Sequence, residues 1–195
     1  MRLILASSSP RRAELLNRLG LDFVVSPADV DESRHPEEGP GVYVERVARA
    51  KALAITGSSD DLIVAADTAV VHDGHVLGKP GHPEEARSML RRLQGDTHEV
   101  FTGMAVAHDE ILESLVDVTE VTMLPLTDQE IDDYVDRGEP MDKAGAYALQ
   151  GRGGLYVKSI SGSPFTVIGL PVHLLPRLVA RVGARLDQFD LRSNL

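Results

Sequence analysis

Three short segments of the chain combine hydroxyl, cationic and carboxylate groups that together suit the binding of a small anion. They are Ser7-Ser8-Ser9-Pro10-Arg11-Arg12, Asp67-Thr68 and Gly78-Lys79-Pro80. Hydroxyls, guanidinium groups and the free amides at the start of a helix all favour negative charge. A buried carboxylate such as Asp67 is costly unless a cation or a proton donor lies beside it. The elements that flank these segments must therefore bring them together.

The serine and arginine segment follows an apolar run at residues 3–6 and precedes an amphipathic run at residues 13–19. Ser9 suits the N-cap of a helix, Pro10 suits its first position and Gly20 suits its C-terminal cap. The pattern predicts a strand, a loop and a helix. Two interpretations of the loop fit: an anion cradle, or an ordinary capped helix with two solvated arginines.

The aspartate segment follows residues 62–66, an apolar run that predicts a buried strand. Asp67 and Thr68 are expected at the carboxyl end of that strand, where ligands bind in α/β sheets. Asp73-Gly74 predicts a two-residue hairpin turn that returns the chain toward Lys79. Asp67 is therefore either a functional carboxylate answered by a lysine or a strand-end residue that caps a turn.

Lys51 lies on a predicted helix over residues 43–55, within the apolar face formed by Val44, Val47 and Ala48. Its side chain either runs along this face to solvent or is held inward against an anion. If it points inward to a bound anion, it is an uncompensated buried cation when that anion is absent. Lys51→Met is then expected to leave thermal stability equal or slightly higher.

Local signals predict the remaining elements. Helix signals are present at residues 83–93, from Thr127 to Gly138 through a capping box, and at residues 172–182, where Pro176 either kinks the helix or marks its first turn. Strand patterns occupy residues 22–26, 99–107 and 112–123, and a hairpin about Gly162 is expected from residues 155–160 and 165–168. Residues 27–40 and 138–154 are predicted loops, and the polar end at residues 185–195 is expected to be frayed.

The composition excludes several classes of protein. The 195 residues include 20 basic and 30 acidic ones, a formal net charge of −10, which disfavours binding to long nucleic acid or to an anionic membrane. With no cysteine the chain has no disulfides and no thiolate zinc site, which suits a cytoplasmic location. No signal peptide or membrane span is predicted. Residues 1–195 are expected to form a single domain, and the seven histidines are expected at solvated surface positions.

The chain resembles the Maf family of nucleoside triphosphate pyrophosphatases along its whole length. The motifs that carry the resemblance are Leu5-Ala-Ser-Ser-Ser-Pro-Arg-Arg12, Ala66-Asp-Thr68, Gly78-Lys-Pro80, Gly138-Glu-Pro-Met-Asp-Lys-Ala-Gly-Ala-Tyr147, Leu149-Gln-Gly151 and Gly169-Leu-Pro171. The resemblance implies an α/β fold of the inosine triphosphatase-like (Maf/Ham1) type, with a mixed β-sheet, flanking helices and two lobes around a central cleft. It also implies a divalent metal cation (Mg, Mn or Co), often a homodimer, and cleavage between the α- and β-phosphates to give a nucleoside monophosphate and pyrophosphate.

The resemblance also implies roles for single residues. Asp67 would be the catalytic base that activates water, a metal ligand, or both, and Glu32 would be the second metal ligand. The residues implied for triphosphate binding are Ser8, Arg11, Arg12, Lys51 and Lys79.

Base selection depends on the branch of the family. The branch that acts on 7-methylguanosine triphosphate has an aromatic residue at the position of Arg11, Gln at Thr68 and Glu at Gln150. This chain is similar to the other branch, which acts on dTTP and UTP, and the residues assigned to specificity are Arg12, Thr68 and Gln150. An amide both donates and accepts hydrogen bonds, which suits a pyrimidine edge with two carbonyls around one N–H.

Two functions from different classes follow. The first is a hydrolase that removes dTTP, UTP and modified pyrimidine triphosphates from the nucleotide pool. The second is a nucleotide-binding regulator of septum formation and cell division that acts through a protein partner. A carboxylate at Asp67 beside bound polyanion favours the enzyme, because binding alone does not require one.

Overall fold

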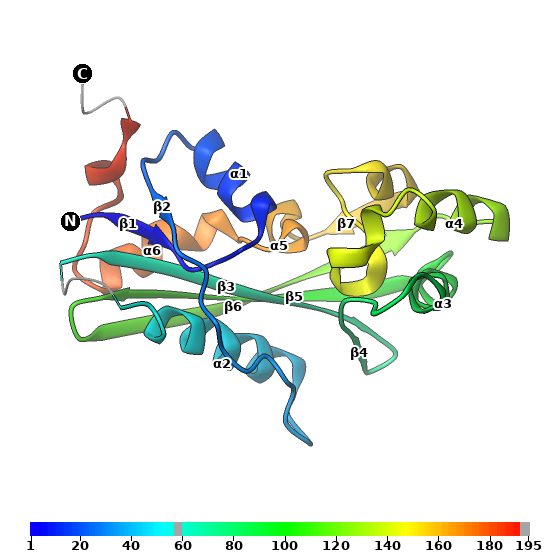
Figure 1. Ribbon diagram of the computed structural model, residues 1–195, viewed down its shortest axis with the longest axis horizontal. Helices are drawn as coiled ribbons and strands as arrows, with labels where there is room; N and C mark the ends of the chain where they lie inside the picture. Colours follow the sequence, from blue (N-terminus) through cyan, green and yellow to red (C-terminus); the bar gives the residue numbers. More distant parts are fainter. Residues whose placement is uncertain (57–59, 192–195) are drawn as a thin grey trace. The chain divides into compact units, whose positions relative to one another are not determined.

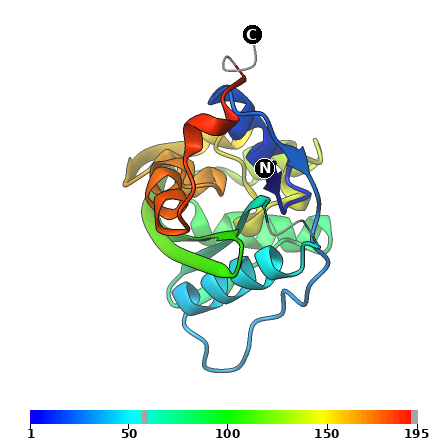
Figure 2. The same cartoon turned by 90° about the vertical axis from the view of Figure 1, so that its left-hand side faces the viewer.

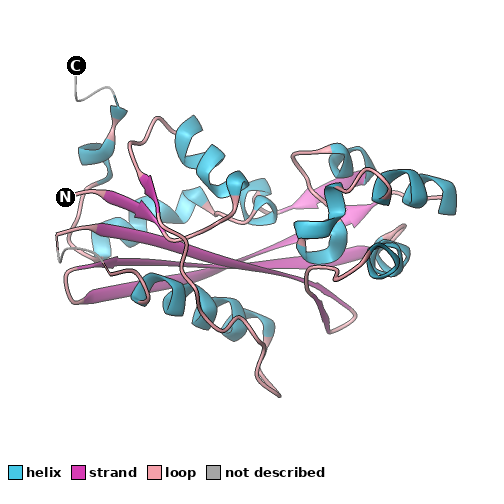
Figure 3. Ribbon diagram, in the orientation of Figure 1, coloured by secondary structure: helices cyan, strands magenta, loops and turns pink. Residues whose placement is uncertain are grey.

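A mixed β-sheet runs through the fold of the computed structural model, which describes residues 1–56 and 60–191. The described strands are β1 Leu3–Leu5, β2 Val24–Val25, β3 Leu62–His72, β4 His75–Leu77, β5 Thr97–His108, β6 Ile111–Met123 and β7 Val157–Ser161. They lie in the order β2-β1-β3-β5-β6-β7, with β4 paired to β3 (Figure 3). β1 is parallel to β2 and β3, whereas β4 is antiparallel to β3 and β7 is antiparallel to β6. The predicted mixed sheet is confirmed.

Helices flank the strands, as expected (Figure 1). The described α-helices are α1 Pro10–Arg18, α2 Pro40–Leu53, α3 Pro83–Leu93, α4 Asp128–Val135, α5 Pro164–Ile168 and α6 Leu175–Arg181. The 3-10 helices are η1 Glu139–Asp142, η2 Ala144–Ala146, η3 Arg152–Tyr156, η4 Val172–Leu174 and η5 Leu186–Phe189.

The chain divides into two compact units. Unit 1 comprises Met1–Asp67, Thr102–Asp117 and Gly169–Leu195, and unit 2 comprises Thr68–Phe101 and Val118–Ile168. β3, β5 and β6 each continue along the chain from one unit into the other. That residues 1–195 form a single domain stays a prediction.

In unit 1, α2 covers one side of the strands, and α1 and α6 lie on the other side (Figures 1 and 2). Small side chains allow α2 to approach the strands closely, and the cluster that α2 forms with them consists of Ile4, Ala6, Ala48, Ala52, Ile63, Ala65, Ala105 and Ala107. At Gly103 of β5 a Cβ atom would lie only 2.5 Å from the Val44 carbonyl oxygen of α2. The helix backbone therefore rests directly on this strand, and only glycine leaves room for it.

Unit 2 has its own apolar core. α3 packs against α4 and η2. The buried side chains of this core are Val70, Leu77, Ala86, Met89, Leu90, Leu93, Val100, Val121, Met123, Ile131, Tyr134, Val135, Ala146 and Tyr147.

Several local predictions are confirmed. α3 has the predicted bounds, and the Thr127 and Glu130 side chains form the capping box of α4. The hairpin turn at Asp73-Gly74 joins β3 to β4, with His72 opposite His75. Pro176 lies in the first turn of α6, where its missing N–H costs no hydrogen bond.

The predicted strand end at Asp67 is wrong. β3 continues to His72, so Asp67 and Thr68 lie within the strand. The apolar residues that follow Thr68 are buried and pair with β4, which extends the strand. Asp67 does not interrupt it because its charge is compensated by Lys51, whose Nζ lies 2.8 Å from Oδ1.

The predicted hairpin about Gly162 is also wrong in its second half. β7 pairs with β6, but residues 164–168 form the helix α5. Pro164 favours a helix start because its ring fixes φ and it has no N–H to lose. Gly162 adopts a φ of 132°, and a Cβ there would lie 2.5 Å from Thr119 Oγ1. This close approach brings the Ser163 N–H to Thr119 Oγ1 at 2.9 Å and begins the helix.

The C-terminal segment is packed rather than frayed over its described residues. η5 buries Phe189, and the Asp22 N–H donates to the Phe189 carbonyl at 2.6 Å. Leu21 forms a bridge with Asp190, and the Leu191 N–H donates to the Gly20 carbonyl at 2.8 Å. An aromatic side chain in this polar segment provides the apolar area that docks it. Residues 192–195 lie outside the described residues.

The prediction that all histidines are solvated is wrong for His98, which is buried, and both His72 and His108 are only partly exposed. His98 is 2% exposed, and its Nε2 lies 2.8 Å from the Tyr147 hydroxyl. The His72 side chain is 11% exposed and its Nε2 lies 3.0 Å from Asp96 Oδ2. Both residues lie on strands at positions that face neighbouring elements, which outweighs their polarity.

Candidate active site

Lys51 and Asp67 meet because helix and strand periodicity place them on facing sides of unit 1. Alternation along β3 puts Asp67 on the same face as Ile63 and Ala65, which pack under α2. On α2, Lys51 follows Val44, Val47 and Ala48 along the buried stripe. The side chain of Lys51 is therefore directed at the sheet, as the inward interpretation of the sequence expects.

Two carboxylates compensate the charge of Lys51. Its Nζ lies 2.8 Å from Asp67 Oδ1 and 2.8 Å from Glu32 Oε1. Lys51 is 6% exposed and Asp67 is 7% exposed, whereas the Glu32 side chain is 45% exposed. The anion that holds Lys51 inward is thus supplied by the protein. The expectation that Lys51→Met is neutral for stability rested on an uncompensated cation and no longer holds.

Glu32 is held in place from α2. The Tyr43 hydroxyl donates to the Glu32 carbonyl at 2.9 Å, and Arg46 Nη2 donates to the Ser33 carbonyl at 2.9 Å. Arg46 also binds Glu38 through Nε at 2.7 Å, which lowers the pKa of Glu38 to about 2. The acidic segment predicted to be an irregular loop is therefore bound at Glu32 and at residues after it by the helix that carries Lys51.

The charges of the same region also affect the pKa of Tyr43. Burial is the main cause that raises the pKa of its hydroxyl, and the carboxylates of Asp67 and Glu32 raise it further. Tyr43 remains protonated at neutral pH and can donate its hydrogen bond to the Glu32 backbone.

Arg12 is bound to the backbone and to a serine at the start of α1. Its Nε donates to the Gly169 carbonyl at 2.7 Å, and its Nη1 donates to Ser7 Oγ at 3.0 Å. Burial lowers the pKa of the Arg12 guanidinium; the carboxylates of Asp67 and Glu32 oppose this, and Arg11 adds to the lowering. Arg12 thus interacts electrostatically with both carboxylates, and Arg11 lies close enough to Arg12 to affect its charge.

Ser7, rather than Ser8, is the serine that organises the loop. Ser7 is buried, and its Oγ accepts hydrogen bonds from the Ser9 N–H at 3.2 Å and from Arg12. Ser8 is exposed, which leaves its hydroxyl facing solvent. Ser9 occupies the predicted N-cap position of α1 with an extended backbone, but its side chain makes no capping hydrogen bond. The position of Ser7 directly after a buried strand was the sequence signal for its burial.

The charges of this cluster suit a polyanion with a divalent cation. Three cations, Lys51, Arg11 and Arg12, accompany the carboxylates of Glu32 and Asp67. Oxygens of the two carboxylates converge on one ammonium group, and carboxylate oxygens are the donors that Mg²⁺ or Mn²⁺ prefers. The donor set therefore fits a hard cation, although among the described residues no group of three or more histidine, aspartate or glutamate side chains is placed to hold one.

Thr68, Lys79 and Gln150 belong to unit 2. Thr68 directly follows Asp67 on β3 and is half-buried. Lys79 is exposed just after β4, beside Gly78, whose carbonyl accepts from the Gly145 N–H at 3.1 Å. Gln150 is exposed in the loop of residues 138–154, between η2 and η3. The contacts thus gather Lys51, Glu32, Asp67 and the two arginines within unit 1, while Thr68, Lys79 and Gln150 are placed on unit 2.

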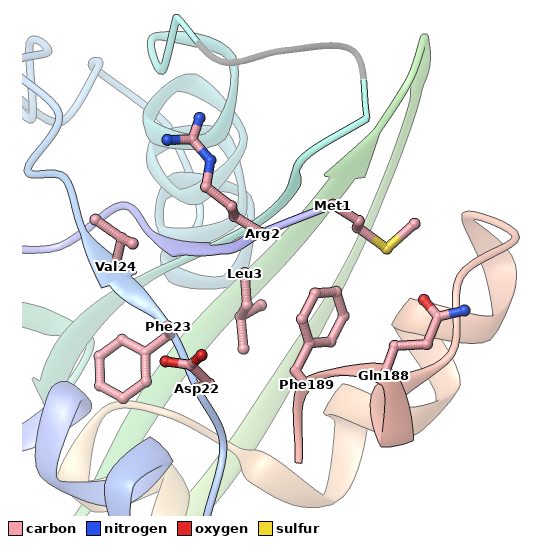
Figure 4. A pocket seen from close by; sticks show the side chains of 8 residues that line it. All are labelled: Met1, Arg2, Leu3, Asp22, Phe23, Val24, Gln188 and Phe189. Atoms are coloured by element: carbon pink, nitrogen blue, oxygen red, sulfur yellow. The ribbon is translucent and has the colours of Figure 1, made fainter. Parts of the chain in front are cut away.

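A separate cavity of about 230 Å³ lies beside the N- and C-terminal segments of unit 1 (Figure 4). Its lining residues all differ from the predicted site residues; they are Met1, Arg2, Leu3, Asp22, Phe23, Val24, Gln188 and Phe189. Within residues 1–56 and 60–191, no helix is both long enough and apolar enough to span a membrane.

The chain is similar to several known proteins over most of its length. The chain is 52% identical over 187 residues to the dTTP/UTP pyrophosphatase of Anaeromyxobacter dehalogenans (strain 2CP-C), which covers 93% of this chain and 94% of that protein. It is 48% identical over 185 residues to the dTTP/UTP pyrophosphatase of Moorella thermoacetica (strain ATCC 39073 / JCM 9320), covering 93% and 95%. The solved Ham1 protein of Staphylococcus aureus is 14% identical, with a TM-score of 0.45 over 63% of this chain and 72% of that one. Residues 2–182 match the family described as Maf-like protein, and this chain belongs to that family.

Proposed function

We propose that this protein is a nucleoside triphosphate pyrophosphatase that hydrolyses dTTP and UTP. The observation that carries the proposal is the buried Lys51, whose Nζ lies 2.8 Å from both Glu32 and Asp67 beside two arginines. Hydrolysis of a triphosphate needs cations for the phosphates and a carboxylate for water, and this cluster contains both kinds of charge. The relatives named dTTP/UTP pyrophosphatase support the choice of substrate.

Each charged residue of the cluster has a role in this reaction. Lys51, Arg11 and Arg12, with Ser8 and Lys79, bind the triphosphate and neutralise its charge. Asp67 accepts a proton from water as the water oxygen bonds to the α-phosphorus. The bond from the α-phosphorus to the oxygen that bridges to the β-phosphorus then breaks, so that a nucleoside monophosphate and pyrophosphate leave.

A divalent cation completes the proposal. Glu32 and Asp67 are the residues that would hold it, because their oxygens already converge on a cation in the form of Lys51. When bound, such a cation supplies charge stabilisation to the phosphate oxygens. The oxygen donors suit Mg²⁺, Mn²⁺ or Co²⁺.

Base selection is assigned to Thr68, Gln150 and Arg12. Gln150 is exposed in its loop and therefore available to a ligand. Its amide can donate to a pyrimidine carbonyl and accept from the ring N–H. Because Arg12 is bound to Ser7 and Gly169, we expect its contribution to selectivity to act by positioning the loop around Ser8. A homodimer and a cytoplasmic location stay predictions from the resemblance and the composition.

The test is a panel of nucleoside triphosphates with Mg²⁺, assayed for pyrophosphate release by the wild-type protein and by Asp67→Asn. We expect dTTP and UTP to be the best substrates. Removal of the base should lower kcat by about 10²- to 10⁴-fold. Nucleotide binding, measured by calorimetry, should change much less.

Two outcomes would contradict the proposal. Near-normal turnover by Asp67→Asn at neutral pH would remove Asp67 from its role. Tight nucleotide binding with no pyrophosphate release from any member of the panel would instead support the nucleotide-binding regulator.

A further inference from the structure

A single carboxylate lies at the centre of the loop that carries Gln150. Glu139 Oε1 accepts hydrogen bonds from the Tyr134 hydroxyl at 2.8 Å and from the Gly153 N–H at 3.1 Å. Its Oε2 accepts from the Arg152 N–H at 3.1 Å. Consecutive backbone amides that converge on one anion form a binding concavity, and here the protein supplies the anion.

Tyr134 binds the backbone on the other side of Gln150. Its side chain is 1% exposed, and its hydroxyl oxygen accepts from the Ala148 N–H at 3.2 Å. The backbone is therefore bound two residues before Gln150, through Tyr134, and two and three residues after it, through Glu139. Gln150 itself is exposed at the centre of this bound segment.

Glycines allow the loop to close tightly around the carboxylate. A Cβ at Gly151 would lie 2.4 Å from Glu139 Oε1, and a Cβ at Gly153 would lie 2.6 Å from the Tyr134 hydroxyl. Gly151 has a φ of −105°, which any residue adopts. A side chain at Gly151 would therefore have to displace the Glu139 carboxylate, whereas the backbone conformation itself does not call for glycine.

The carboxylate is charged at neutral pH. Burial acts to raise the pKa of Glu139, but the hydrogen bonds from Gly153, Tyr134 and Arg152, with the charge of Lys143, outweigh it and hold the pKa below its ordinary value. Lys143 Nζ also donates to the Glu139 carbonyl at 2.9 Å. These contacts lie within unit 2 and bind no predicted catalytic residue.

We propose that Glu139 is a positioning residue for base selection: with Tyr134 it fixes the backbone on both sides of Gln150 so that the amide meets the base in one orientation. This inference rests on the proposed function, because it concerns the discrimination between nucleotides. Loss of the hold should increase the mobility of residues 148–153. Contacts to pyrimidines depend on the orientation of Gln150, whereas contacts to the phosphates do not.

The test compares kcat and KM for dTTP, UTP, ATP and GTP in Glu139→Gln and Gly151→Ala. Glutamine keeps the shape but turns an NH₂ group toward backbone donors, and the alanine methyl group displaces an intact carboxylate. Both variants should lower kcat/KM for dTTP and UTP at least about tenfold, mainly through KM, with ATP and GTP changed less than about threefold. Glu139→Asp, which keeps the charge, should recover part of the loss.

The matched control is Glu130→Gln. Glu130 is a carboxylate of the same unit that binds the Thr127 N–H at 2.8 Å in the capping box of α4, away from this loop. We expect the Glu130→Gln substitution to lower the melting temperature without changing the selectivity between nucleotides. Two results would overturn the proposal. One is a fall of kcat/KM by the same factor for all four nucleotides in both Glu139→Gln and Gly151→Ala, and the other is unchanged selectivity in variants that are folded.

Hydrogen exchange separates this inference from the proposed function. The amides of Arg152 and Gly153 should lose protection in Glu139→Gln but keep it in Glu130→Gln. If the wild-type protein hydrolyses none of the panel, the proposed function fails by itself. Exchange then decides the inference: unchanged protection of these two amides overturns it, and selective loss supports the hold on the loop.

Discussion

The two units bury polar groups in different ways. In unit 1 a buried polar contact is ionic, between Lys51 and Asp67 at 2.8 Å, with Glu32 as a second partner of Lys51. In unit 2 a buried pair is formed by His98 and Tyr147, with His98 Nε2 2.8 Å from the Tyr147 hydroxyl. Burial and the nearby charge of His72 lower the pKa of His98 to about 4, and burial raises the pKa of Tyr147. The second pair is therefore neutral at physiological pH.

The difference between the ion pair of unit 1 and the neutral pair of unit 2 agrees with the proposed function. A buried ion pair is weak evidence for stability, because desolvation of the charges opposes their attraction. Unit 1 contains a buried ion pair at the place where the proposed reaction needs positive groups for the phosphates and a carboxylate for water. Unit 2 keeps only neutral groups in its core and places its charged Glu139 in a loop, where backbone amides satisfy it. Charge is thus retained where it serves binding and chemistry.

Lys51→Met should give the largest change in stability. The substitution leaves the Asp67 carboxylate buried without its ammonium partner, so the free energy of unfolding should fall by about 3 kcal/mol. Urea denaturation measures this loss. Lys158→Met, at an exposed position of β7, is the control and should change stability by less than about 0.5 kcal/mol.

The double variant Lys51→Met/Asp67→Leu sharpens the comparison. Replacing both charges with apolar side chains should recover most of the stability, because Glu32 is partly exposed and can return to solvent. Equal stability of Lys51→Met and the wild-type protein would show that Lys51 is not held by the carboxylates.

Unit 2 should instead be sensitive to acid. The folded-state pKa of His98 is lowered from 6.5 to about 4, so below pH 6.5 the unfolded chain binds a proton that the folded chain does not. His98 therefore contributes stability above pH 6.5, and this contribution, up to about 3 kcal/mol, is lost as the pH falls to about 4.

Urea denaturation between pH 7.5 and 4.5 measures the effect, with His98→Gln as the control. Gln keeps a hydrogen-bonding partner for Tyr147 but does not titrate, so its pH profile should be flatter. The subtraction removes the contributions of groups that both proteins share. Parallel profiles for the two proteins would exclude His98 as the source of acid sensitivity.

Gln150→Glu should give the smallest change in free energy but the most selective one. A carboxylate only accepts hydrogen bonds and repels the carbonyls of thymine and uracil, so kcat/KM for dTTP and UTP should fall about tenfold, or ~1.4 kcal/mol. ATP and GTP should change much less, and Thr68→Gln added to this variant should move preference toward 7-methylguanosine triphosphate. Gln129→Glu, an exposed position on α4, is the control. An equal loss for every nucleotide would assign Gln150 to phosphate or backbone contacts.

The sequence by itself predicted the elements whose signals are local. The bounds of α3, the capping box at Thr127 and the turn at Asp73-Gly74 depend on residues within a few positions of each other. The buried stripe of α2 also followed from periodicity, but periodicity left open whether Lys51 points inward or runs along the helix to solvent. Ordered motifs identified the family, because they record residues required together irrespective of how the fold arranges them.

Only the tertiary structure decided which groups bind one another. Asp67 lies within β3 and not at its end, Arg12 is bound to a carbonyl 157 positions away, and the Gln150 loop is held by Glu139. Local propensity carries no information on such pairs, since they form when packing brings distant segments together. Burial then selects the partners: a charge or a polar hydrogen inside the protein must find a compensating group, and only the folded chain determines which group is within reach.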